Sequence, residues 1–193
     1  AAVKWLGVYP GNAARDLPDF HPIVVLNDGE TGMPLVVMDG RWITGARTAA
    51  ISAVAARYLA LKESETLGVI ACGLQARSHL AAFAAEFPLR RVLCWSRRRE
   101  SAERFAADAE ARGLATTIVD KPYDAVARAD LVASLVADIP DIAPFLDADW
   151  LRPGSFLALV DMGRPWHVGS LGRLDKIVTD DLRQNTAGDA GQG

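Results

Sequence analysis

The sequence predicts an α/β fold built on a parallel sheet. From residue 66 onward, short apolar runs alternate with amphipathic segments, and strands that alternate with helices pair in parallel through right-handed crossovers. The apolar run at residues 66–70 ends in a tight turn of small residues, 71–73, which leads directly into a helical pattern. This strand, turn and helix is typical of a Rossmann-type doubly wound sheet.

Composition narrows the class of protein. Of the 193 residues, 50% are hydrophobic and 23% are charged, and the net charge is -3. These values are ordinary for a globular protein and leave no basic excess for a nucleic-acid or membrane surface. No apolar window approaches the roughly 18 residues of a membrane span. With no signal-peptide pattern and two cysteines that read as reduced thiols, we expect a cytoplasmic protein.

The N-terminal part predicts an antiparallel hairpin followed by a long helix. β-branched runs at 22–27 and 34–38 flank a Gly-rich loop at 28–32. A second turn at 39–40 leads to Thr44, which we interpret as the N-cap of the helix. The side chains expected to face the core follow a helical spacing: Ile51, Val54, Ala55, Tyr58 and Leu59.

The remaining elements follow in alternation. Helices are predicted over 76–87 and 100–112, the second ending at Gly113. Strands are predicted over 67–70, 91–95, 116–119, 131–136, 155–160 and 176–179.

The turn after the first of these strands predicts an anion site. A dinucleotide pyrophosphate binds backbone N–H groups at a helix N-terminus, where the dipole favours negative charge. Gly73 is the position where a side chain would collide with the pyrophosphate, and Leu74 and Gln75 would offer N–H groups. Ala71 stands where the pattern asks for glycine. The alternative is a turn whose small residues serve packing only.

The end of the next strand indicates which dinucleotide is bound. NAD sites usually carry an acidic residue there, and NADP sites carry arginine. Here Ser96 takes the place of the acid and is followed by Arg97 and Arg98. A guanidinium suits a 2′-phosphate, so NADP is favoured over NAD. The alternative is a solvated basic start of a helix.

Several motifs together resemble the ornithine cyclodeaminase/mu-crystallin family. The segments that carry the resemblance cover almost the whole chain, in order: 3–5, 9–12, 31–35, DGRWITGARTAA at 39–50, GVIACGLQA at 68–76, WLRPGS at 150–155, and 180–181. The resemblance implies hydride transfer between NAD(P) and the α-carbon of an amino acid or cyclic imine, in a homodimer.

The resemblance also implies a domain division. Residues 1–46 would form part of an α+β substrate and dimerisation domain, truncated at its N-terminus. Residues 47–184 would form the NAD(P)-binding domain, and 185–193 a flexible tail or truncated continuation. Family members are longer at both ends, so we expect both ends to be truncated.

The family's site residues map onto this chain by position. Lys4 would contact substrate and assist proton movement, and Arg47 would clamp a carboxylate or the cofactor phosphates. Thr48 would donate to the pyrophosphate, and Val136 and Met162 would also contact the cofactor. The alternatives are a surface lysine and an arginine paired to a nearby aspartate.

One position departs from the family pattern. Aligned without gaps from Pro153, the catalytic aspartate of cyclodeaminases falls on Gly163. Asp161, two residues earlier, would reach the nicotinamide edge as a catalytic and cofactor-binding residue, or would be a turn residue; Arg164 and His167 are further polar candidates. Reduction of a ketimine or pyrroline carboxylate, or amino-acid dehydrogenation, therefore fits better than cyclodeamination. The sequence is also compatible with a non-catalytic protein that binds NADPH or a small ligand, and with an inactive remnant.

His21 and His79 read as structural, and no spacing of His, Cys and carboxylates suggests a metal.

Overall fold

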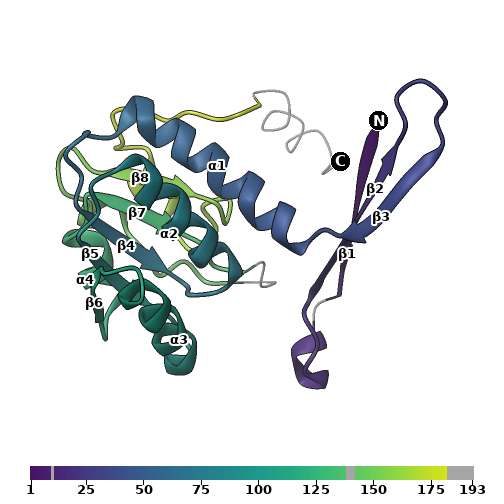
Figure 1. Cartoon of the computed structure of the whole chain (residues 1–193). Helices are drawn as coiled ribbons and strands as arrows, with labels where there is room; N and C mark the ends of the chain where they lie inside the picture. Colours follow the sequence, from purple (N-terminus) through teal and green to yellow (C-terminus); the bar gives the residue numbers. More distant parts are fainter. Residues whose placement is uncertain (10, 138–141, 182–193) are drawn as a thin grey trace, which may run out of the picture.

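Two β-sheets of different kinds organise the chain in the computed structural model, which describes residues 1–9, 11–137 and 142–181. A five-stranded sheet forms the body of the molecule, and a three-stranded sheet stands beside it at the N-terminal end of a long helix, α1 (Arg41–Leu59) (Figure 1). The candidate site residues lie on the body and along the helix that joins the two sheets, except Lys4, which lies on the smaller sheet.

The five-stranded sheet is parallel throughout. Its strands are β4 (Thr66–Ile70), β5 (Arg91–Trp95), β6 (Ala115–Ile118), β7 (Leu131–Ser134) and β8 (Phe156–Leu159). Their order is β6-β5-β4-β7-β8, and every neighbouring pair runs in parallel. The chain winds outward from β4 in one direction and then returns to build outward from β7 in the other. This confirms the predicted doubly wound α/β fold.

Helices cover both faces of this sheet. α1, α2 (Leu74–Glu86) and α3 (Arg99–Glu110) lie on one face, and α4 (Pro122–Ala127) lies on the other. Side chains alternate along each strand, so Leu67 and Val69 of β4 enter the first core while Ile70 enters the second. A strand buried on both faces is a near-continuous apolar run, as the sequence of β4 is.

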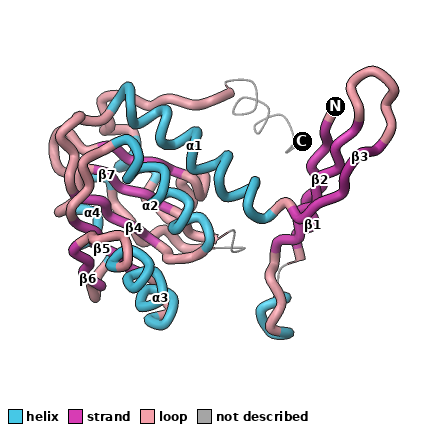
Figure 2. The backbone as a smooth tube through the Cα atoms, viewed as in Figure 1, coloured by secondary structure: helices cyan, strands magenta, loops and turns pink. Residues whose placement is uncertain are grey.

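The three-stranded sheet is antiparallel, with β2 (Phe20–Asn27) between β1 (Ala2–Val8) and β3 (Pro34–Asp39). The predicted hairpin is thereby confirmed (Figure 2). Its loop is held by Asp28, whose carboxylate accepts hydrogen bonds from the backbone N–H groups of Glu30 (3.0 Å) and Thr31 (2.7 Å). A short 3-10 helix, η1 (Asn12–Arg15), lies between β1 and β2.

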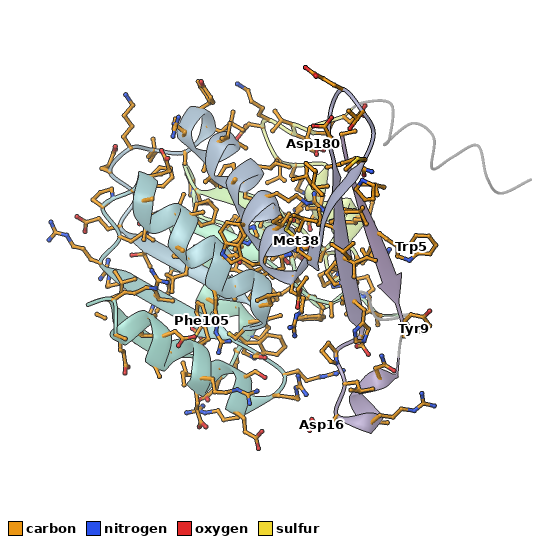
Figure 3. All side chains as sticks on the ribbon, turned by 45° about the vertical axis from the view of Figure 1, so that its right-hand side comes forward. Trp5, Tyr9, Asp16, Met38, Phe105 and Asp180 are labelled. Carbon is orange, nitrogen blue, oxygen red and sulfur yellow. The ribbon has the colours of Figure 1, made fainter. Side chains whose placement is uncertain are left out.

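The two faces of this small sheet differ. Lys4, Val24 and Met38 share one row of the ladder and are partly or fully buried. The next row, Trp5 and Ile23, is exposed, and Trp5 projects away from the helices (Figure 3). The first row therefore faces the molecule, and the second presents an apolar surface to solvent.

The start of α1 differs from the prediction. The helix begins at Arg41 and its N-cap is Gly40, so the interpretation of Thr44 as the cap was wrong. The Thr44 hydroxyl instead donates to the Gly40 carbonyl, 2.7 Å away, inside the first turn. A threonine one turn into a helix can donate its hydroxyl in this way to the carbonyl four residues earlier.

The buried face of α1 also differs from the prediction. Ile51, Val54, Tyr58 and Leu59 are exposed, and Ala55 is half-buried. The buried residues are small: Gly45, Ala49, Ser52, Ala53 and Ala56. Small side chains allow α1 to approach α2 closely, and this close packing outweighs the burial of the larger apolar side chains.

Beyond β8 the chain contains little regular structure. The predicted strand at 176–179 was wrong, because these residues pair with no strand in the described part of the chain. One short helix, α5 (Val168–Leu171), follows β8, and a short 3-10 helix, η2 (Ala148–Trp150), precedes it. The expected domain boundary at 46/47 falls inside the continuous α1, and the tail at 185–193 lies outside the described residues. Among the helices described, none is both long and apolar enough to cross a bilayer.

Candidate functional site

The carboxyl ends of the parallel strands form the candidate site. In open α/β sheets ligands bind at this edge, where the strand order reverses. Here the reversal lies between β4 and β7. The predicted residues Gly73, Ser96, Val136 and Asp161 follow β4, β5, β7 and β8 in turn. The sheet therefore brings residues from four separate segments to one edge.

The turn after β4 has the geometry of a phosphate-binding turn. Ala71 has φ 71°, the left-handed conformation that favours glycine, and its N–H donates to the Trp95 carbonyl at 2.8 Å. Gly73 is the N-cap of α2, and a Cβ added there would meet no protein atom within 4 Å. The first N–H groups of a helix lack partners within the helix. The turn thus presents free donors beside an open space.

The N-termini of α1 and α2 lie side by side. A Cβ on Gly45 would lie 2.5 Å from Ser78 Oγ and 3.6 Å from Ser78 Cβ, so the two helices approach closely at this glycine. Further along, His79 Nδ1 donates to the Gln75 carbonyl (2.8 Å) and its Nε2 accepts from Ser52 Oγ (3.0 Å), because a carbonyl can only accept. His79 is buried, and burial lowers its pKa. His79 therefore connects the two helices, as expected of a structural histidine. The two helices run parallel, so the positive ends of both helix dipoles point to the same edge of the sheet.

Lys4 meets the start of α1. Its Nζ lies 3.5 Å from Thr44 Oγ1, and Arg47 is near enough for its positive charge to act on the lysine. Partial burial, and then the charge of Arg47, lower the pKa of Lys4. A lysine with a lowered pKa can exchange a proton nearer to neutral pH. Thr48 is one turn further on, with its hydroxyl donating to the Thr44 carbonyl at 2.8 Å.

The basic segment after β5 is open to solvent. Ser96 is half-buried, and Arg97 and Arg98 are exposed just before α3. Neither arginine forms an ion pair with any residue that the structure describes. Arg99, by contrast, pairs with Glu103 and Asp120. Arg97 and Arg98 are therefore available to an anion at this edge.

Asp161 lies at the end of β8 and is buried. Its Oδ2 accepts from Ser134 Oγ (2.6 Å) and Val136 N (3.2 Å), and its Oδ1 accepts from Gly163 N (3.2 Å). Burial raises the pKa of Asp161, and these hydrogen bonds oppose part of the rise. Met162, the next residue, is 70% exposed. The backbone around both residues is thus held by the carboxylate.

The donors of this edge suit a dinucleotide. The space at Gly73 adjoins two helix N-termini, and Oε1 of Gln75 is buried with no hydrogen-bond partner among the described residues. Buried polar atoms normally have partners, and this oxygen can accept from a donor that the chain does not supply, such as a ribose hydroxyl. In the described residues no group of three or more His, Cys, Asp or Glu side chains has the arrangement of a metal site.

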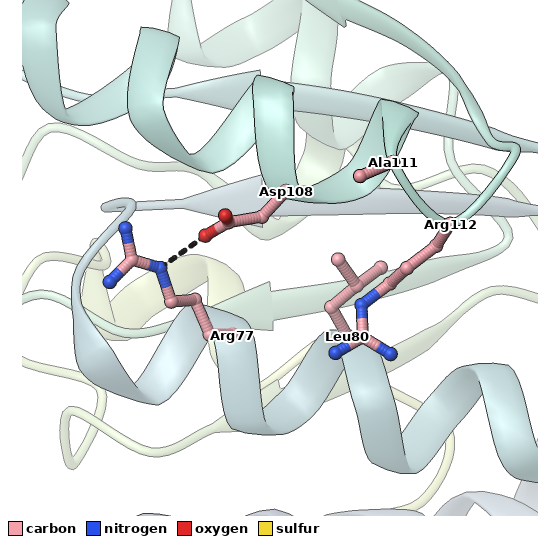
Figure 4. A pocket seen from close by; sticks show the side chains of 5 residues that line it. All are labelled: Arg77, Leu80, Asp108, Ala111 and Arg112. Atoms are coloured by element: carbon pink, nitrogen blue, oxygen red, sulfur yellow. Dashed lines mark ion pairs between the residues drawn. The ribbon is translucent and has the colours of Figure 1, made fainter.

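A hollow of about 410 Å³ lies elsewhere, between α2 and α3 (Figure 4). It is lined by Arg77, Leu80, Asp108, Ala111 and Arg112, and Arg77 forms an ion pair with Asp108 across it. None of the turn residues 71–75 lines it. This hollow is on the outer surface of the helical layer and is separate from the candidate site.

Three residues at the site escaped sequence reasoning. Thr44 contacts Lys4, and Ser134 and Trp166 form a chain of hydrogen bonds with Asp161. A polar residue at the carboxyl end of an apolar strand was a usable signal for Ser134. His167 and Arg164, in the same segment as Trp166, are exposed.

Known proteins are similar to this chain over most of its length. The sequence model of the ornithine cyclodeaminase/mu-crystallin family matches residues 1–170. The alanine dehydrogenase of Archaeoglobus fulgidus is 34% identical, over 95% of this chain and 56% of its own length. The ketimine reductase mu-crystallin of Rattus norvegicus is 33% identical, over 84% of this chain and 50% of its own. The chain therefore spans about half the length of the curated relatives it matches.

A solved structure is similar as well. It is the Delta(1)-pyrroline-2-carboxylate reductase of Thermococcus litoralis in complex with NADH and L-proline. The TM-score is 0.76 and the identity 32%, over 81% of this chain and 48% of that one.

Proposed function

The chain belongs to the ornithine cyclodeaminase/mu-crystallin family, and on that premise we propose that it is an NAD(P)-dependent oxidoreductase. Its reaction is hydride transfer at the α-carbon of an amino acid or of a cyclic imine. The observation that carries this proposal is the turn at the end of β4, where Gly73 leaves open space in front of two helix N-termini. The relatives named above are reductases and dehydrogenases of amino acids and imines.

The residues at the carboxyl edge of the sheet have separate roles in holding the cofactor. Gly73, Leu74 and Gln75 receive the pyrophosphate on backbone N–H groups, with Arg47 and Thr48 beside them. The bound nicotinamide supplies the hydride chemistry, and the protein supplies orientation and charge.

Lys4 and Arg47 face the substrate. The guanidinium binds the α-carboxylate or the cofactor phosphates, and Lys4 moves a proton at the substrate nitrogen. The lowered pKa of Lys4 supports this role, because such an amine changes its protonation state more readily near neutral pH.

The test is an initial-rate assay. The chain is mixed with NADPH or NADH and a cyclic imino acid such as pyrroline-2-carboxylate, and loss of the reduced-nicotinamide absorbance is followed. We expect Lys4→Met to lower kcat/KM by about a hundredfold or more, and the exposed Lys62→Met to leave it unchanged. Equal rates for Lys4→Met and wild type would contradict the role of Lys4. Binding of NADPH without turnover of any imine or amino acid would favour a non-catalytic binder.

Cyclodeamination is the less favoured activity. Gly163 stands where the resemblance places the catalytic aspartate, and its φ of 71° favours glycine.

We propose that NADP is preferred over NAD. Ser96, Arg97 and Arg98 follow β5, and the two arginines are exposed without ion-pair partners in the described chain. The double variant Arg97→Ala, Arg98→Ala should weaken NADPH binding by about tenfold or more and leave NADH binding almost unchanged. Calorimetric titration measures both, and equal losses for the two cofactors would contradict the assignment.

A homodimer in the cytoplasm completes the proposal. The outer face of the three-stranded sheet exposes Val3, Trp5 and Val37, and a contiguous apolar face of this kind suits a protein interface. Cys72 and Cys94 are both buried free thiols, which suits a reducing compartment. Light scattering on the purified chain gives the mass, and a monomer at all concentrations would contradict the dimer.

A further inference from the structure

The carboxylate of Asp161 is buried and held by the protein on both of its oxygens. The residue is only 8% exposed, and both carboxylate oxygens accept hydrogen bonds from the protein. Oδ2 is shared between the Ser134 hydroxyl and the Val136 N–H, and Oδ1 receives the Gly163 N–H. These bonds tie the end of β8 to the end of β7.

The network extends to Trp166. The fully buried indole donates from Nε1 to Ser134 Oγ at 2.8 Å, while Ser134 donates to Asp161. Trp166 N also donates to the Gly163 carbonyl at 3.0 Å. Asp161 and Trp166 are therefore anchored to the same hydroxyl, and the loop 162–165 between them is closed at both ends.

The closed loop holds an unusual backbone. Met162 (φ 58°) and Gly163 (φ 71°) are consecutive left-handed residues, and Met162 is not a glycine. Such a conformation persists only where the surroundings enforce it, and it is often found at functional sites. The hydrogen bond from Gly163 N–H to Asp161 Oδ1 spans Met162, and the Met162 side chain remains exposed at the carboxyl edge of the sheet.

We propose that Asp161 is a positioning residue rather than a catalytic one: with Ser134 and Trp166 it fixes the Val136 and Met162 segments as the surface that receives the nicotinamide ring. The proposal rests on the proposed function, because it places the nicotinamide half of the dinucleotide at β7 and β8. The pyrophosphate and adenosine half lies at β4 and β5. A defect in the network should therefore affect one half of the ligand and spare the other.

NADH and ADP-ribose separate the two halves, since ADP-ribose lacks the nicotinamide. Asp161→Asn is the sharpest variant. Whichever way the amide is turned, its NH₂ faces Gly163 N–H or Val136 N–H, so one donor opposes another. We expect calorimetric titration to show NADH binding weakened about tenfold, with the Kd of ADP-ribose changed less than about twofold. Ser134→Ala and Trp166→Phe should weaken NADH in the same selective way and serve if Asp161→Asn does not fold.

Asp130→Asn is the matched control. Asp130 Oδ2 also accepts two backbone N–H groups, from Glu65 (3.0 Å) and Thr66 (2.8 Å), but at the opposite, amino edge of the sheet. Its loss should lower the melting temperature and leave both ligands binding as before.

Any of three results would overturn the proposal. Equal weakening of NADH and ADP-ribose in the network variants would assign the network to general stability. Unchanged NADH binding in the network variants would show that the loop 162–165 does not position the nicotinamide. An Asp161→Asn variant that binds NADH normally but does not turn over substrate would make Asp161 a catalytic residue. A wild-type chain that binds neither ligand would instead refute the proposed function itself.

Discussion

At the scale of single residues, Ala71 is the position where local chemistry and the demands of the site conflict. The turn after β4 requires a left-handed residue, and an alanine adopts it with φ 71°. A Cβ in this region is strained by its neighbouring carbonyl. The turn nevertheless forms, because Ala71 N–H bonds to the Trp95 carbonyl and the preceding strand, β4, is fully buried.

Ala71→Gly should therefore stabilise the fold. Relief of the strain, about 1–2 kcal/mol, exceeds the extra chain entropy of glycine, about 0.5–1 kcal/mol. We expect the free energy of unfolding, from urea denaturation, to rise by up to about 1 kcal/mol. The same substitution at exposed Ala81, inside α2, should lower it by about 1 kcal/mol. A loss of stability in Ala71→Gly would refute the strained turn.

His79 should make the stability of the fold depend on pH. Burial lowers the pKa of His79 in the native state, so the unfolded chain takes up a proton first as pH falls. The unfolding free energy should then decrease as pH drops below about 6.5. His79→Gln should show a flatter curve between about pH 7 and 5.5 in urea denaturation, and exposed His21→Gln should follow wild type. Parallel curves for wild type and His79→Gln would contradict the account.

At the scale of elements, glycine and alanine decide which surfaces meet. α1 buries a strip of small residues against α2 and leaves Ile51, Val54 and Tyr58 exposed. β4 likewise carries Gly68 where α4 crosses it: an added Cβ would overlap the Ala125 carbonyl and lie 2.9 Å from Ala129 Cβ.

Gly68→Ala should consequently be costly. The backbone of α4 would have to move away from β4, at a cost of about 1–3 kcal/mol in unfolding free energy. Gly29→Ala is its control, because an added Cβ there meets nothing within 4 Å. Denaturation of both variants tests the packing, and a Gly68→Ala as stable as Gly29→Ala would show that α4 does not press on β4.

These elements differ in how well the sequence predicts them. The strands of the parallel sheet were predictable because buried apolar runs stand out against polar neighbours. The buried face of α1 was not, because the pattern of large apolar residues indicates burial only where the partner surface leaves room for them. The strand expected at 176–179 does not form for a related reason: these residues are exposed, and strand preference depends on side chains that pack on a half-buried sheet surface.

At the scale of the whole molecule, the fold gathers residues that are far apart along the chain. The order β6-β5-β4-β7-β8 brings the segments after β4, β5, β7 and β8 to one edge, and α1 connects that edge to Lys4 on the other sheet. The positions of Gly73, Ser96 and Lys4 were predictable from motifs. The contacts Lys4–Thr44 and Asp161–Ser134–Trp166 were not, because they join residues between 27 and 40 positions apart, and no local pattern encodes them.

The most direct test of a dinucleotide site at this edge is the binding of NADH to Gly73→Val. Gly73 has an extended backbone that any residue can adopt, and its Cβ would meet no protein atom. We predict a melting temperature equal to that of wild type and NADH binding weakened at least about tenfold by calorimetry, because the side chain occupies the space of the pyrophosphate. If a stably folded Gly73→Val bound NADH as tightly as wild type, the dinucleotide would not lie on this turn.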